Sequence, residues 1–185
     1  MTDVLDAIHE DHANMAQMLN ALERQLQAFE AGDTPDYDIV KGVVAYCLDY
    51  PDLYHHPKED LVFERLKAVD PGAAAKVGDL PGEHGALAAR TRRLQDAVAA
   101  VLGDLEVPRG QFDAALREFL DAYRRHMNQE ERAFLPAARR ALSAEDLAEI
   151  ETHLRRPDDP LFGAPSEDRF AALRRDILAW AEDAA

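Results

Sequence analysis

Hydrophobic side chains recur at steps of three and four residues over most of the chain, which is the pattern of amphipathic α-helices. Thr2-Asp3 predicts the N-terminal cap of a first helix, and Gly32 predicts its end at about residue 31. One face of this helix carries His12 together with Leu5, Ile8, Met15, Leu19, Leu22 and Leu26. Because no alternating run rich in Val, Ile or Thr occurs, the pattern predicts an all-α protein.

Proline and glycine divide the following residues into further helices. Asp70-Pro71-Gly72 is expected to be a connection between the second and third of them. The pattern predicts three more long helices, over residues 35–69 with kinks at Pro51 and Pro57, over residues 73–105 with a break or kink near Pro81-Gly82, and over residues 108–142.

The C-terminal part of the sequence predicts two shorter helices. Ser143 and Asp146 resemble a capping box, with Asp in place of Glu, for a helix that ends at Leu154. After a loop over residues 155–166, Ser166 is expected to cap a last amphipathic helix with Phe170, Leu173, Ile177 and Trp180. We therefore predict an up-down four-helix bundle over residues 1–155. Residues 156–185 add a loop and a C-terminal helix that packs on the bundle or contacts a second chain.

Composition and charge limit the partners of such a bundle. The 185 residues are 47% apolar and 31% charged, as in a folded domain, and their formal net charge is −15. Because so acidic a surface repels phosphates, we expect neither nucleic acid nor a membrane as partner, and a monomer or weak dimer. The single cysteine, Cys47, excludes a disulfide within the chain. Without a signal pattern or a long apolar run, the sequence predicts a cytoplasmic protein.

An internal repeat is the most informative feature of the sequence. Residues 55–63 read HHPKEDLVF and residues 126–134 read HMNQEERAF, which share a His, three residues, a Glu, an acidic residue, two residues and a Phe. A lone histidine precedes each motif, as Asp11-His12 and as Glu83-His84. The two lone histidines are 72 residues apart, and the two motif histidines are 71 apart. The first two long helices and the next two therefore resemble two copies of one helical hairpin.

Helix geometry places the repeated polar residues at one point. Positions four apart on an α-helix lie within about 40° of each other, so His55 and Glu59 share a face, as do His126 and Glu130. With His12 and His84 from the other helices, these side chains predict a buried metal site. Two phenylalanines eight residues after the motif histidines are expected to wall the site, Phe63 and Phe134.

Weaker candidates follow from the same angles. Glu131 lies about 140° from His126, so Glu130 is the preferred ligand. His56 lies about 100° from His55, at the edge of the inward arc, and is either a ligand or a supporting residue. We take His56 as a ligand, and we keep three residues as supporting or alternative ligands, His9, Tyr123 and Glu131.

The donor set indicates the metal. Five imidazoles and two carboxylates are too many for one tetrahedral zinc, and contain too much nitrogen for calcium or magnesium. Such a set suits iron or manganese, with zinc or manganese as substitutes for iron. Two bridging carboxylates would hold two iron ions, joined by an oxo or hydroxo group. Three imidazoles on one ion and two on the other leave one open position for a small ligand.

These motifs resemble the hemerythrin family in its HHE cation-binding branch, over about residues 1–155. The resemblance implies an up-down bundle with a di-iron centre that binds or senses O2, nitric oxide or peroxide. Oxygen carriers of the family have a second histidine on the third helix, four residues from the first, but here Leu80 and Ala88 flank His84 at that spacing. His56 is the natural replacement. Those carriers also have a carboxylate five residues after the last histidine, where this chain has Glu131.

Two functions remain open from the sequence. The first is a non-catalytic di-iron protein that binds or senses a small diatomic or peroxide ligand. The second is an enzyme-like role in peroxide or nitric oxide detoxification, or in iron donation for iron–sulfur cluster repair. A ferritin-like oxidase would need Glu-x-x-His on two helices, and neither Glu59 nor Glu130 has that histidine.

Overall fold

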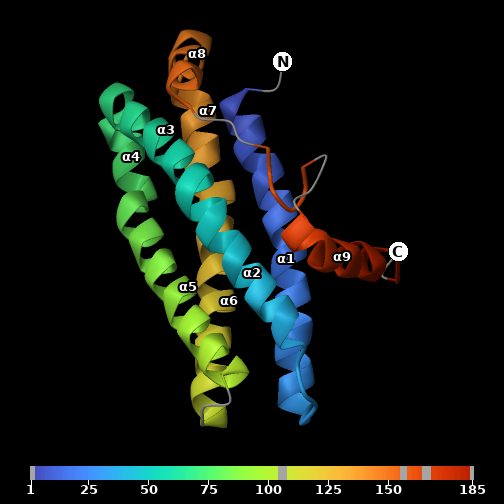
Figure 1. The fold of residues 1–185 in the computed structure, drawn as a ribbon. Coiled ribbons are helices and arrows are strands. Elements are labelled where there is room, and N and C mark those ends of the chain that lie inside the picture. Colours follow the sequence, from blue (N-terminus) through green and yellow to red (C-terminus); the bar gives the residue numbers. More distant parts are fainter. Residues whose placement is uncertain (1–2, 104–107, 155–157, 164–167, 184–185) are drawn as a thin grey trace.

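The computed structural model describes residues 3–103, 108–154, 158–163 and 168–183, and all regular secondary structure in these ranges is helical. The all-α prediction is therefore confirmed. Four helical columns lie side by side in Figure 1. They are α1 (Val4–Ala31); α2 (Tyr37–Asp49), η1 (Pro51–His55) and α3 (His56–Val69); α4 (Pro71–Val77) and α5 (Leu80–Leu102); and α6 (Arg109–Gln129), η2 (Glu130–Phe134) and α7 (Leu135–Ala141).

The first column begins and ends as the sequence predicts. The Asp3 carboxylate accepts hydrogen bonds from the backbone N–H groups of Leu5 and Asp6, both at 2.9 Å. Gly32 ends the helix with φ +94°, in the left-handed region that glycine adopts at little cost. Because these local signals agree with the apolar pattern, the bounds of α1 could be predicted to within two residues.

Proline reshapes the second column. Pro51 lacks an N–H group and its ring would clash with the carbonyl four residues earlier, so the chain changes to a π-helical turn over residues 51–55. The wider turn is closed by the bond from His55 N–H to Tyr50 O, at 3.3 Å. Pro57 lies in the first turn of α3, where its missing N–H group costs nothing. The predicted kink at Pro51 is thus a change of helix type.

Two predicted boundaries in the third column are displaced by a few residues. The expected connection over residues 70–72 is shorter, because Asp70 caps α4 by accepting from Ala73 N–H at 2.8 Å. The break expected near Pro81-Gly82 lies at Gly78, which has φ +101°. Pro81 instead occupies the first turn of α5, where proline is favoured.

The C-terminal region closes one end of the bundle and crosses its side. Ser143 and Asp146 form the predicted capping box of α8 (Ala144–His153), and Arg65 on α3 donates to the Asp146 carboxylate. The short η3 (Asp168–Phe170) leads into α9 (Ala171–Asp183), which extends at a steep angle from the side of α1 in Figure 1. It contacts both α1 and α2. Three predicted features lie outside what the structure describes, namely the helix end at Leu105, the cap at Ser166 and the side chain of Trp180.

A polar layer separates the apolar core into two clusters. On α1, Ile8 belongs to the cluster near α8, and Met15 belongs to the larger cluster below it. His12 lies between them and is 3% exposed. Leu173 and Ile177 of α9 join the larger cluster, so α9 shares the core of the bundle.

Within the described ranges, no helix combines the length and the apolarity that a membrane span requires.

Two glycines test the packing of α9. A Cβ atom at Gly85 on α5 would meet open space, so Gly85→Ala should raise the free energy of unfolding by about 1 kcal/mol through helix propensity. A Cβ atom at Gly42 on α2 would lie 3.3 Å from Leu173 Cδ2, so Gly42→Ala should gain less. Urea unfolding of the metal-free variants measures both changes. Equal gains would show that α9 does not pack at Gly42 in solution.

Candidate metal centre

Seven polar side chains from all four columns meet in the layer between the two core clusters. His12 comes from α1 and His84 from α5, while the second and fourth columns each bring histidine and glutamate. All seven are at most 6% exposed. These residues are the ones that the sequence predicts, His12, His55, His56, Glu59, His84, His126 and Glu130.

Glu59 lies at the centre of this layer and faces imidazoles on two sides. Its Oε1 atom is 3.2 Å from His12 Nε2 and 3.3 Å from His55 Nε2. Its Oε2 atom is 3.3 Å from His84 Nε2. Each oxygen therefore belongs to a different group of imidazoles.

Glu130 has the matching arrangement from the opposite column. Its Oε2 atom is 3.3 Å from His12 Nε2. Its Oε1 atom is 3.1 Å from His126 Nε2 and 3.5 Å from His84 Nε2. The two carboxylates together span the layer between two half-sites.

The nitrogen ligands divide unequally between these half-sites. The donor atoms of His12, His55 and Glu59 lie within 4.8 Å of one another. A second group with the same spacing consists of Glu59 with three imidazoles, those of His56, His84 and His126. We call the first group the near half-site and the second the far half-site.

Several inward-facing atoms of the layer lack a hydrogen bond of ordinary geometry among the described residues. They are Glu59 Oε2, Glu130 Oε2 and His126 Nε2. A buried polar atom without a partner costs about 1–3 kcal/mol, and more when it is charged. Because these atoms converge from different columns, cations bound in the two half-sites would satisfy all three. The donor set therefore fits metal ions.

Each of the five imidazoles also has a carboxylate near its outer nitrogen, and four of them, all except His56, form a hydrogen bond with it. Such a carboxylate fixes the tautomer and the orientation of a metal-binding imidazole. The Nδ1 distances are 2.7 Å from His12 to Glu131, 3.0 Å from His55 to Asp11, 3.4 Å from His56 to Asp52, 2.9 Å from His84 to Asp60, and 3.2 Å from His126 to Glu83.

Residues 3–138 match the sequence model of the hemerythrin HHE cation-binding domain. The chain belongs to the hemerythrin HHE family. No curated protein and no solved structure matches the chain significantly. The matched segment ends within α7, so α8 and α9 lie beyond it.

Four of the outer carboxylates were missed in the sequence, Asp11, Asp52, Asp60 and Glu83, although the repeat contains the signal for all of them except Asp52. In this hemerythrin-like chain the acidic residue before each lone histidine binds the motif histidine of the next column, as Asp11 and Glu83 do. The acidic residue after each motif glutamate binds a lone histidine, as Asp60 and Glu131 do. Each copy therefore carries two adjacent pairs, Asp11-His12 with Glu59-Asp60 in the first and Glu83-His84 with Glu130-Glu131 in the second. In each pair one residue faces the centre and its neighbour contacts an imidazole from outside.

The π-helical turns explain why His56, taken as a ligand at the edge of the inward arc, and Glu131 turn further inward than α-helical angles place them. Bonding from residue i to i+5 places more residues in each turn, so consecutive side chains differ less in direction than on an α-helix. His56 directly follows η1 and is 4% exposed, with its ring stacked 4.3 Å from that of His84. Glu131 lies within η2 and faces His12 rather than solvent alone.

The other predicted residues lie around the seven. His9 is on the surface, where its Nδ1 is 3.0 Å from both oxygens of Glu131. Tyr123 is buried with its ring 6.2 Å from that of His56. The rings of Phe63 and Phe134 meet at 6.1 Å, one helical turn beyond the two glutamates.

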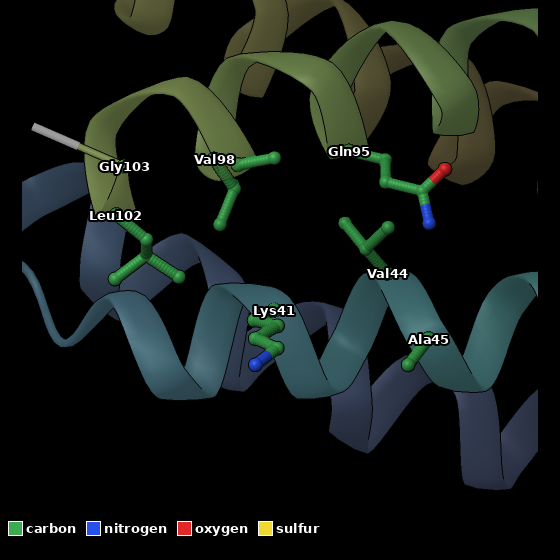
Figure 2. Close-up of a pocket in the computed structure, with 8 residues that line it drawn as sticks. Lys41, Val44, Ala45, Gln95, Val98, Leu102 and Gly103 are labelled. Carbon is green, nitrogen blue, oxygen red and sulfur yellow. The ribbon is translucent and has the colours of Figure 1, made fainter. Parts of the chain in front are cut away.

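A separate cavity of about 430 Å³ lies between α2 and α5 (Figure 2). Val44 and Val98 point into it from the two helices, and Lys41 and Gln95 are its polar residues. None of the seven centre residues lines it. The cavity is therefore distinct from the candidate metal centre.

The charges of the layer support one another in the metal-free protein. Burial on its own would lower the pKa of His12, but the carboxylates of Glu130 and Glu59 raise it to about 11. Burial opposes the charging of His84 in the same way, and Asp60 and Glu130 raise its pKa to about 11. Burial lowers the pKa of His56 to about 4, so this imidazole is neutral. Burial and Glu59 act to raise the pKa of Glu130, but the neighbouring imidazoles bring it to about 2.

These shifts predict how the metal-free protein responds to pH. Protonated His12 and His84 stabilise it fully below the ordinary histidine pKa of 6.5, and this contribution is lost as pH rises towards 11. The Glu130 carboxylate contributes above its ordinary pKa of 4.5 and less as pH falls towards 2. Urea unfolding of the chelator-treated protein should therefore show declining stability from pH 6.5 to 10.

The metal-loaded protein is the control for this pH series. Metal binding requires neutral imidazoles, so loading strengthens as the pH rises and the decline should disappear. Constant stability of the metal-free protein between pH 6.5 and 10 would contradict the assignment of protonated imidazoles.

Proposed function

We propose that this chain is an up-down four-helix bundle that binds two iron ions between Glu59 and Glu130, and that it binds or senses O2, nitric oxide or peroxide there. One observation carries the proposal: each of the two buried carboxylates directs its two oxygens to different groups of imidazoles. A carboxylate placed in this way suits a bridge between two cations.

The protein donors divide between the two ions as the half-sites do. The near ion would take His12 and His55 with one oxygen from each glutamate, and the far ion would take three imidazoles with the other oxygens. The near ion thus has one protein ligand fewer. The open position for a small ligand belongs on the near side.

The internal repeat accounts for this inequality. His56 adds a third imidazole to the far half-site, and the corresponding residue of the second copy is Met127. A thioether is a soft and weak ligand for iron in an oxygen and nitrogen site. The second copy therefore supplies no sixth imidazole, and the two half-sites differ by one nitrogen.

The donor chemistry favours iron. Imidazole with carboxylate is a set that iron accepts, and manganese or zinc would bind as substitutes. Bound iron supplies the change of oxidation state on which binding of O2 or nitric oxide depends. Four outer carboxylates hold their imidazoles by hydrogen bonds with the Nε2 atoms inward, and the apolar clusters on both sides exclude water.

Metal analysis of protein loaded with Fe²⁺ without air tests the number of ions. We expect two iron ions per chain, because seven donors divided in two groups exceed what one ion uses. Exposure of the same sample to air, followed by ultraviolet–visible spectra, shows whether O2 binds and whether removal of O2 reverses the change. A stoichiometry near one at saturating iron would contradict the proposal.

The two adjacent glutamates of η2 should differ in their effects. Glu130 faces both half-sites, so Glu130→Ala should lose at least one of the two ions. Glu131 supports His12 from outside, so Glu131→Ala should retain two ions with roughly 10–100-fold weaker binding. Metal titration measures both, and Glu10→Ala on the exposed side of α1 is the control. A larger loss in Glu131→Ala would show that Glu131 is the bridge.

A further inference from the structure

A groove between α1 and α6 reaches the near half-site from the surface. Its volume is about 440 Å³, and the nearly buried His12 forms part of its lining. On the α1 side the groove is lined by the small side chains of Ala13 and Ala16, and Met127 lines the α6 side. The groove therefore brings solvent next to a ligand of the centre.

Glu131 connects the surface of this groove to the buried ligand. Its Oε1 atom is 2.7 Å from His12 Nδ1 and 3.0 Å from His9 Nδ1. The His9 side chain is 65% exposed and that of Glu131 is 34% exposed, whereas that of His12 is 3% exposed. One carboxylate thus contacts an imidazole in solvent and an imidazole of the centre.

This connection exists on only one side of the repeat. The residue that corresponds to Glu131 in the first copy is Asp60, which contacts His84 in the same way. Asp60 is similarly exposed, but the residue that corresponds to His9 in the second copy is Pro81. The imidazole at the surface is therefore an addition to the near side, beyond what support of the inner histidine requires.

We propose that His9 and Glu131 form an entry site, which captures a divalent transition-metal cation from solvent and passes it to the near half-site. The inference rests on the proposed metal function and concerns the route by which the ions arrive. Imidazole nitrogen with carboxylate oxygen is a donor pair for such cations. A cation held by His9 and Glu131 would lie next to His12, the near half-site imidazole that the same Glu131 oxygen contacts.

The charges in the groove permit a cation to enter. Arg124, the one guanidinium of its lining, is held by the Glu23 carboxylate at 2.7 Å and by Asn20 at 3.1 Å. Its positive charge is therefore compensated. The carboxylate of Glu131 faces the same groove.

An entry site and a supporting residue predict different kinetics. An entry site lowers the barrier in both directions, so its loss slows uptake and release by the same factor and leaves the affinity unchanged. A residue that only supports His12 stabilises the loaded centre, so its loss speeds release and weakens binding. The two rates together separate these roles.

Stopped-flow uptake of Co²⁺ by the metal-free protein, followed through the visible bands of bound Co²⁺, provides the test. For His9→Ala we expect roughly tenfold slower uptake, because a local binding group raises association rates by about that much or more. Release into excess chelator should slow by the same factor, with two ions bound at saturation. The matched control is His153→Ala, which removes an exposed histidine on α8.

Uptake by His9→Ala at the wild-type rate would overturn the entry site, and so would faster release with weaker binding. Neither result affects the di-iron proposal as long as the wild-type protein binds two ions. A wild-type stoichiometry of one would contradict the proposed function itself, whatever the rates of the variant.

Discussion

The structure depends on the burial of two carboxylates in the middle of a helical bundle. Glu59 and Glu130 are fully buried, and the removal of each charge from water costs several kcal/mol unless positive charge meets it. In the metal-free protein protonated imidazoles meet this need, which is why the pKa values of His12 and His84 rise. In the loaded protein metal ions would take over the same role. The buried carboxylates are thus stable only together with the imidazoles or metal ions that balance their charge.

The set is arranged in shells, which follow from the geometry of helices. A glutamate four residues after a histidine shares its inward face, and the acidic residue beside that glutamate reaches the neighbouring column. Carboxylates therefore occupy the centre, imidazoles surround them, and a second shell of carboxylates holds the imidazoles. Lys58 adds a positive charge outside this second shell, since its ammonium group donates a hydrogen bond to Asp11 at 2.7 Å. The ring of imidazoles lies between negative charge on both sides.

The repeat makes the two halves of the centre nearly equivalent, and its few departures give the half-sites different residues. His56 strengthens the far half-site, where Met127 leaves the near one short of an imidazole. His9 adds a surface imidazole on the near side, where the second copy has Pro81. Under the proposed function, an open coordination position and a route from solvent would thus belong to the same ion. Two substitutions in a duplicated hairpin suffice for this asymmetry.

The sequence by itself determined the helical class, the bounds of α1 and the set of residues that meet in the polar layer. These features depend on contacts within a few residues, such as a cap, a glycine in the left-handed region or a histidine and glutamate four apart, and a sequence displays them directly. The break at Gly78 was misplaced because Pro81 is also compatible with the first turn of a helix. Only the tertiary structure decided which columns face each other, and hence that Asp11, Asp52, Asp60 and Glu83 hold the imidazoles. It also decided the direction of His56 and Glu131, because π-helical turns shift the angle of every following side chain. Such turns arise from a local clash at proline or from packing between columns, which the regular period of the sequence does not record.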